Sequence, residues 1–130
     1  MKTLMNDVIS ALSALTELQW VDDNLGQLTQ EVPNVEYPCA LVGIGEANGP
    51  FGDFTLEVTI ACEVPKTENG NPAKLHSLAE SMYNLIQKAD LAISQLEGEQ
   101  YAPLTGIKIT SDKNYYPARF ILSYTTVVYS

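Results

Sequence analysis

The sequence is poor in basic residues. Seven Lys and Arg residues stand against sixteen Asp and Glu residues, which gives a formal net charge of -9 over 130 residues. The basic residues are dispersed along the chain, whereas neutralising nucleic-acid phosphates requires a clustered Lys and Arg surface. Specific nucleic-acid binding is therefore disfavoured. Solubility alone is sufficient to explain the acidic balance at this point.

Histidine is even scarcer, because His76 is the single one in the chain. A single histidine excludes a metal site built from several histidines. A catalytic triad with a Ser or Cys nucleophile would have to use this one imidazole. We interpret His76 as a solvated helix residue. Asp22 and Asp23 could ligate a hard cation, but they are better explained as turn residues. The sequence predicts no catalytic, cofactor or metal site.

The two cysteines carry no metal-ligand spacing. Pairing of residues 39–44 with residues 54–64 as a hairpin would place Cys39 almost opposite Cys62. We interpret both as reduced thiols that serve as small buried hydrophobes. A metal or redox role is the alternative, and it would need further ligands.

Long hydrophobic runs are absent as well. Asn6, Asp7 and Ser10 interrupt the apolar residues near the N-terminus, so we expect no secretory signal. No run is long enough to span a bilayer. These absences favour a cytosolic protein.

What the sequence does contain indicates one domain over residues 1–130, with two amphipathic helices. Hydrophobic residues make up 45% of the chain, an ordinary value for a domain of common size. Apolar periodicity predicts a first helix from Thr3 to near Glu17. It predicts a second helix that begins at Pro72 and is followed by a short separate turn over residues 91–96.

Strands are predicted over residues 39–44, 54–64, 106–110 and 117–130, with residues 18–28 as a short extended piece. Strict alternation in residues 54–64 is typical of an antiparallel strand with one buried face. This order predicts an α+β fold: a mostly antiparallel sheet of about four strands with two helices packed on one face. The other face of the sheet would then be uncovered.

The last predicted strand carries apolar side chains on both of its faces. Phe120, Leu122 and Tyr124 fall on one side under a period of two. Tyrosine rings near the C-terminus suit protein contacts, although β-propensity explains their clustering equally well. Because exposed apolar area usually marks a contact surface, we predict a subunit interface on the other side, at Ile121, Val127 and Tyr129.

The layout and one motif resemble a known family. The motif combines Trp20-x-Asp22, Gly26-Gln27-Leu28 and Tyr37-Pro38, and the order of elements extends the similarity over nearly the whole chain. In these features the sequence resembles the small tail-terminator and tail-completion proteins of long-tailed bacteriophages and prophages. The resemblance implies a structural virion protein, not an enzyme, without cofactors. Such a protein forms a homo-oligomeric ring of about six copies.

The resemblance also implies partners and sites. The ring would cap the tail tube at its head-proximal end, dock to the head or neck, and let DNA pass without specific binding. Glu57 and Glu63 would face the channel, where an acidic wall repels phosphates over roughly 10 Å at moderate salt. Loops 46–53 and 65–71 are candidates for contact with tube and head proteins. The contact residues expected in these loops are Asn48, Pro50, Phe51, Glu68 and Asn69.

Assembly would take place in the host cytoplasm, and the protein would end at the head-proximal end of the virion tail. Two alternatives stay open. A head-tail connector, neck or tail-tube protein of a phage would share this type of assembly and differ in its partner. An unrelated ligand-binding or enzymatic α+β domain is the other alternative, because one layout can host different functions.

Overall fold

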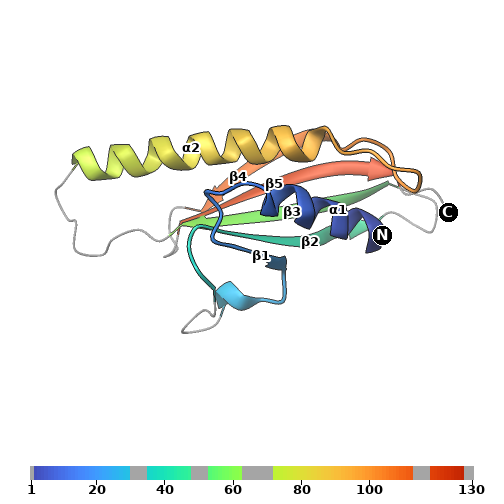
Figure 1. Ribbon diagram of the computed structural model, residues 1–130, viewed down its shortest axis with the longest axis horizontal. Coiled ribbons are helices and arrows are strands. Elements are labelled where there is room, and N and C mark those ends of the chain that lie inside the picture. The colour runs from blue at the N-terminus through green and yellow to red at the C-terminus, as the bar shows by residue number, and fades with distance from the viewer. Residues whose placement is uncertain (1, 30–34, 48–52, 63–71, 113–117, 128–130) are drawn as a thin grey trace.

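The protein has a curved sheet with helices on one side (Figure 1). The computed structural model describes residues 2–29, 35–47, 53–62, 72–112 and 118–127. Along the chain the elements are α1 (Lys2–Ser13), β1 (Trp20–Asp23), the 3-10 helix η1 (Gln27–Thr29), β2 (Cys39–Ala47), β3 (Asp53–Cys62), α2 (Pro72–Ser94), β4 (Thr105–Asp112) and β5 (Ala118–Val127).

Strand β3 lies at the centre of a five-stranded sheet with the order β1-β2-β3-β5-β4. It pairs antiparallel with β2 on one side and with β5 on the other, and β4 pairs antiparallel with the far side of β5. Only β1 runs parallel to its neighbour, β2. The predicted α+β fold with a mostly antiparallel sheet is confirmed.

The fifth strand, β1, comes from the segment that the sequence predicts only as a short extended piece. Backbone hydrogen bonds join it to β2 beyond both of its ends. The Gln19 N–H donates to the Pro38 carbonyl at 2.8 Å, and the Asn24 N–H donates to the Val42 carbonyl at 2.9 Å. These two bonds fix a strand of four residues whose own sequence carries no alternating pattern.

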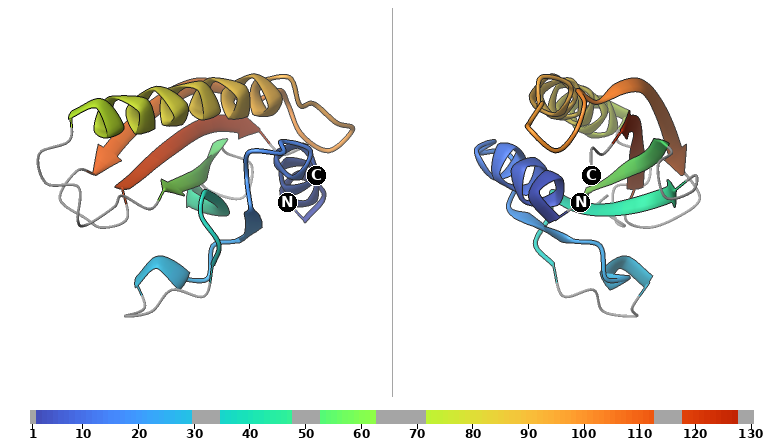
Figure 2. Two further views of the ribbon diagram at one scale, coloured as in Figure 1. Left: turned by 60° about the vertical axis from the view of Figure 1, so that its left-hand side comes forward. Right: turned by 90° about the vertical axis from the view of Figure 1, so that its right-hand side faces the viewer.

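The alternation of apolar and polar side chains along β3 determines which side of the sheet the helices cover. Leu56, Val58 and Ile60 are fully buried on the side that we call the inner face. Both helices lie on this side (Figures 1 and 2), as the sequence predicts. The helix side chains buried against the inner face are Leu4, Val8 and Leu12 of α1 and Met82, Leu85, Ile86, Ala89 and Ile93 of α2. Burial of each large aliphatic side chain contributes about 1.5–3 kcal/mol.

The helix boundaries depart from the prediction in two places. Helix α1 ends at Ser13 and gives way to tighter turns, in which the Leu15 N–H donates to the Leu12 carbonyl at 3.0 Å. Helix α2 begins at Pro72 as predicted, but it continues to Ser94 and includes most of the predicted separate turn. Ile93, one turn after Ala89, extends the buried stripe and so extends the helix.

The two cysteines are almost opposite each other, as the sequence predicts. Cys39 pairs with Ala61, the residue before Cys62. A shift of one residue turns a side chain to the other face of a sheet. Cys62 therefore packs in the inner core and Cys39 packs on the outer face, where a mutual disulfide is incompatible with the sheet. Both side chains are buried, as predicted.

We expect Leu122→Ala to destabilise the protein far more than Leu91→Ala. The Leu122 side chain is fully buried on the inner face of β5, whereas Leu91 on α2 is 59% exposed. Removal of a fully buried leucine leaves a cavity and costs about 3 kcal/mol, while the exposed control should cost less than about 0.5 kcal/mol. Urea denaturation followed by circular dichroism measures both values. Equal losses would contradict the assignment of Leu122 to the core.

Candidate interaction surfaces

A second, smaller hydrophobic cluster covers one end of the sheet's outer face. It is formed by the segment from β1 to the start of β2, which includes η1 and lies on the side of the sheet away from the helices (Figure 2). We call this group the outer cluster. Its members are Leu28, Cys39, Leu41 and Ala61, with Trp20, Val35 and Tyr37 packed against them.

Hydrogen bonds from Gln27 hold the turn that leads into the outer cluster. Its Nε2 donates to the Asp23 carbonyl at 2.9 Å, and its Oε1 accepts from the Leu25 N–H at 2.8 Å. Gly26 between them has φ of 81°, a left-handed conformation that glycine adopts without strain. The Gly26-Gln27-Leu28 stretch thus has a structural role in this turn.

Other motif residues serve the same cluster. Trp20 and Tyr37 pack on it, and the Tyr37–Pro38 peptide bond that leads into β2 is cis. Asp22 lies within β1, where its Oδ1 accepts a hydrogen bond from the Asp23 N–H at 2.8 Å. The sequence predicts a turn at these two aspartates, but in the structure they form the end of strand β1.

The expectation that the outer face is uncovered is wrong at one end, and at the other end the described residues are less buried. Exposure rises along β3 away from the outer cluster: Ala61 is fully buried and Thr59 is 7% exposed. Beyond them Glu57 and Thr55 are half-buried. We call the less covered part the open outer face. Its described residues are Thr55 and Glu57 of β3 and Ile121, Ser123, Thr125 and Val127 of β5.

The structure places three of the predicted site residues on this open outer face. Ile121 and Val127 are half-buried on β5, as Glu57 is on β3. The Glu57 carboxylate lies over the backbone of β2, where a Cβ added at Gly45 would come within 2.5 Å of its Oε1. A glycine at position 45 therefore makes room for this side chain.

The other predicted contact residues lie outside the described residues. The predicted loop over residues 46–53 is shorter than expected, because Glu46 and Ala47 belong to β2 and Asp53 begins β3. His76 lies in α2, but its side chain is not among those that the structure describes. The predicted residues that remain without a structural test are Tyr129, Glu63, Asn48, Pro50, Phe51, Glu68 and Asn69.

Strand β4 forms one edge of the sheet. It spans eight residues and pairs with β5 on one side, while no described segment pairs with its other side. An edge strand presents unpaired backbone N–H and C=O groups to the surroundings. Ile121 of β5 lies opposite Thr110 of β4, one strand in from this edge.

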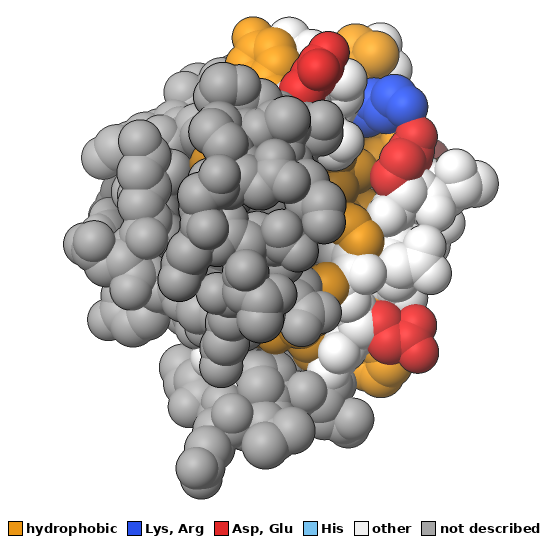
Figure 3. All heavy atoms as spheres, turned by 90° about the vertical axis from the view of Figure 1, so that its left-hand side faces the viewer, with side chains coloured by type: hydrophobic (Ala, Val, Ile, Leu, Met, Phe, Trp, Pro, Cys, Tyr) orange, Lys and Arg blue, Asp and Glu red, His pale blue; other side chains and the backbone are white. Residues whose placement is uncertain are grey.

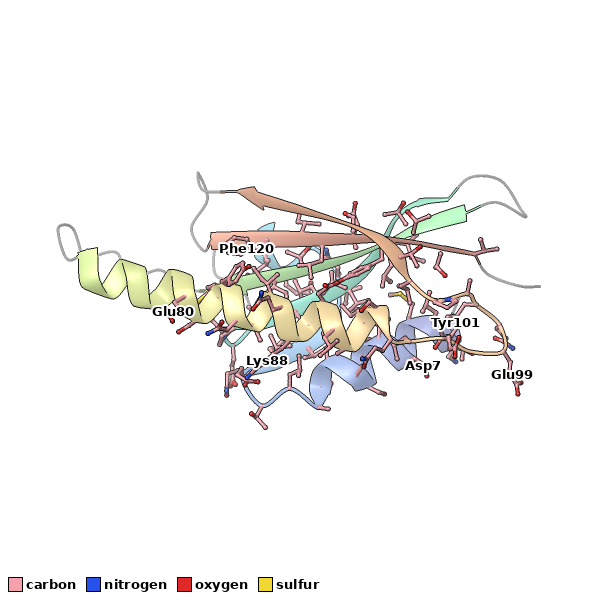
Figure 4. The ribbon with its side chains drawn as sticks, turned by 90° about the horizontal axis from the view of Figure 1, so that it is seen from above. Asp7, Glu80, Lys88, Glu99, Tyr101 and Phe120 are labelled. Atoms are coloured by element: carbon pink, nitrogen blue, oxygen red, sulfur yellow. The ribbon has the colours of Figure 1, made fainter. Side chains whose placement is uncertain are left out.

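Two tyrosine–aspartate pairs join the helices to the rest of the fold, and the sequence gives no signal for either. The Tyr101 hydroxyl donates to Asp7 of α1, and Asp7 and Tyr101 lie close together in Figure 4. The Tyr124 hydroxyl on β5 donates to Asp90 Oδ1 of α2 at 2.9 Å. In both pairs, burial and then the bond to the carboxylate raise the pKa of the tyrosine, that of Tyr101 to about 12.

Helix α2 and β5 also border a groove of about 340 Å³. Sequence periodicity placed Phe120 on the inner face but did not predict this groove. Tyr83 gave a weak signal, because it is a large aromatic residue outside the apolar stripe of its helix, and it is 62% exposed. The residues that line the groove are Tyr83, Ile86, Gln87, Asp90 and Phe120.

Comparison with known proteins adds no relative: no protein-family model matches the chain, and no curated protein matches it. The family resemblance therefore remains a prediction from the sequence. Within the described ranges, no group of three or more His, Cys, Asp and Glu residues is placed to hold a metal ion. None of the helices, over the same residues, combines the length and apolar content needed to cross a membrane.

We expect Gln27→Ala to loosen the outer cluster. The substitution removes both side-chain hydrogen bonds of a residue that is 8% exposed, which costs about 1–2 kcal/mol. Trp20 is the one tryptophan of the chain, so its fluorescence reports on this cluster specifically. The fluorescence transition should move to lower urea concentration, whereas Gln95→Ala, at an exposed position after α2, should leave it unchanged. Identical transitions for both variants would contradict the role of Gln27.

We expect Tyr101→Phe to lower stability at pH 8 by about 1–2 kcal/mol, because a buried hydrogen bond is lost. An unfolded tyrosine titrates near 10, whereas the folded pKa is about 12. This contribution to stability is fully present below about pH 10 and is lost as the pH rises toward 12. The variant should therefore show a shallower fall in the free energy of unfolding over this window.

Urea denaturation at pH 8 and at several values from 10 to 12 measures this effect. Tyr83→Phe is the matched control, because it changes an exposed tyrosine on α2. The assignment fails if Tyr101→Phe and the wild-type protein lose stability equally over the alkaline window.

Proposed function

We propose that this chain is a subunit of a homo-oligomeric ring of the kind that the resemblance to phage tail terminators implies. One observation supports self-assembly above the others: the edge strand β4 lies directly beside the open outer face of the sheet. Among the described residues, this contiguous surface combines unpaired backbone groups with partly exposed apolar side chains. Edges of this kind are templates for pairing with another chain.

The contact with a neighbouring subunit is assigned to the Ile121 end of this surface. Ile121 lies opposite Thr110 of β4 and opposite Thr59 of β3. A neighbour that pairs with β4 and also extends over the open outer face would cover the exposed part of the Ile121 side chain, because β5 lies one strand in from the edge. Burial of apolar area contributes about 25 cal/mol per Å² to association, before the cost of immobilising the subunit.

The positions of Glu57 and Val127 restrict the geometry of such a ring. Glu57 lies opposite Ser123, between Ile121 and Val127 along β5. A single neighbour that contacted both apolar residues would also bury the Glu57 carboxylate, which is costly without a cationic partner. Contact at the Ile121 end leaves Glu57 exposed, as an acidic channel wall requires. Glu63 and Tyr129 keep their roles as predictions from the sequence.

In this proposal the ring caps the tail tube at its head-proximal end, docks to head or neck proteins, and conducts DNA. It would assemble in the host cytoplasm and remain in the virion tail. A connector, neck or tail-tube protein would use the same self-assembly with a different partner. Tube growth separates these roles, because a terminator halts it and a tube protein drives it.

The mass of the purified protein in solution tests the ring. We expect a species of about six times 14.2 kDa by native mass spectrometry. Ile121→Asp should raise the concentration needed for assembly by about tenfold or more, because it places an unpaired charge in the contact. Leu91→Asp on the helix side and Glu57→Gln on the open outer face are controls that should assemble normally. A monomer at all concentrations, or normal assembly of Ile121→Asp, would contradict the proposed contact.

A second experiment tests the terminator role separately. Assembled wild-type protein is added to growing tail tubes of the same virus or prophage and observed by electron microscopy. We expect the protein at one end of each tube and a halt in extension. Unchanged growth, or polymerisation of the protein itself, would contradict a terminator even where the ring is confirmed.

A further inference from the structure

The groove between α2 and β5 combines apolar walls with one carboxylate. Its volume of about 340 Å³ lies at the small end of the range for ligand-binding pockets, roughly 300–1,000 Å³. Ile86, which is 6% exposed, and the partly buried Phe120 belong to the protein core at its base. The Tyr83 side chain is 62% exposed on α2. Phe120 projects from β5 toward α2 (Figure 4).

Asp90 is held in this groove by a buried tyrosine. Its Oδ1 accepts the hydrogen bond from Tyr124, whose side chain is 1% exposed. Burial and the Asp90 carboxylate raise the pKa of Tyr124, so the phenol keeps its proton and remains a donor. Among the described residues, no group donates to the other oxygen, Oδ2. The bond thus fixes the carboxylate and, within the described part of the chain, leaves its second oxygen available to a ligand.

No described cation of this chain neutralises the groove. Lys88, two residues before Asp90, donates instead to Glu17, and this bond lowers the pKa of the Glu17 carboxyl. Glu80 lies on the exposed side of α2 one turn before Tyr83. Acidic, basic and hydrophobic side chains lie next to each other on the described surface of the end of the molecule that Figure 3 shows. Of the described residues that line the groove, Asp90 alone is charged.

A carboxylate beside two aromatic rings has the chemistry that recognises a guanidinium group. The planar cation donates parallel hydrogen bonds to a carboxylate and stacks on aromatic faces. An ammonium group forms the ion pair but lacks the planar stacking. Because this chain contains a single arginine and carries a formal charge of -9, the complementary charge is supplied by a different, basic protein.

We propose that the groove between α2 and β5 binds an arginine side chain presented by a basic segment of a partner protein. Asp90 pairs with the guanidinium group, and Tyr83 and Phe120 contact its faces. The groove lies on the helix side of the sheet, away from the open outer face. The inference is therefore independent of the proposed ring, and either one stands if the other fails.

Titration of the full-length protein with a capped Gly-Arg-Gly peptide, followed by amide chemical shifts in NMR, tests this site. We expect shifts centred on residues 83, 87, 90 and 120. The same peptide with citrulline in place of arginine keeps the shape and removes the charge, and it should bind about tenfold more weakly. Equal binding of the two peptides would overturn the proposal.

Variants identify the residues that recognise the arginine. Asp90→Asn keeps an acceptor for Tyr124 and should weaken binding of the arginine peptide about tenfold. Tyr83→Leu should weaken it about threefold, because a cation–π contact is lost. Glu99→Gln removes an exposed carboxylate at the far end of the molecule (Figure 4) and should leave the affinity unchanged.

Three results would overturn the proposal. One is unchanged affinity in Asp90→Asn while its circular dichroism spectrum and urea transition match the wild type. Another is an equal loss in Glu99→Gln, which would show attraction by net charge alone. The last is a change in the native mass of the protein in Asp90→Asn, because the groove would then contact a second copy of this chain.

Discussion

The pairing of the central strand β3 on both of its edges is the constraint on which the rest of the structure depends. Hydrogen bonds to β2 and β5 fix its register along ten residues, and a slip of one residue would turn every core side chain to the outside. Leu56, Val58 and Ile60 consequently need a layer of helices over them. Helices α1 and α2 take up this position, and the tyrosine–aspartate pairs then connect each helix to a segment beyond it.

The outer face is covered differently, because neither α-helix of the described residues lies on it. A short connecting segment covers only the end that contains Ala61, and the cover depends on the parallel pairing of β1 and on the bonds of Gln27. The motif that resembles tail terminators is located in this segment. Its residues stabilise the fold and leave the remaining surface open, so the motif indicates an architecture more directly than a contact site. Any assembly contact has to be argued from the open part of the face.

The sequence predicts what is local. Alternation in residues 54–64, the apolar stripe of α2 and the start of that helix at Pro72 each depend on neighbours within one or two turns. The structure confirms the helix start, the alternation over residues 55–62 and the part of the stripe from Met82 to Ile93. Cys39 and Cys62 are almost opposite, as expected, but the sequence does not give the offset of one residue that places their side chains on different faces of the sheet. The Asp7–Tyr101 and Asp90–Tyr124 pairs join residues 94 and 34 positions apart, and no sequence period reports such distances. The groove could not be predicted for the same reason, since it requires the position of α2 relative to β5.

Strand β5 supplies residues to both proposed surfaces. Phe120 points to the helix side and lines the groove, whereas its neighbour Ile121 points to the open outer face. The two surfaces are adjacent in sequence but separated by the thickness of the sheet, so occupation of one leaves the other accessible. A shift of β5 by one residue would exchange these two side chains and turn Leu122 out of the core. The burial of Leu122 and Tyr124 therefore holds both surfaces in place at once, and neither surface can change without a cost to the core.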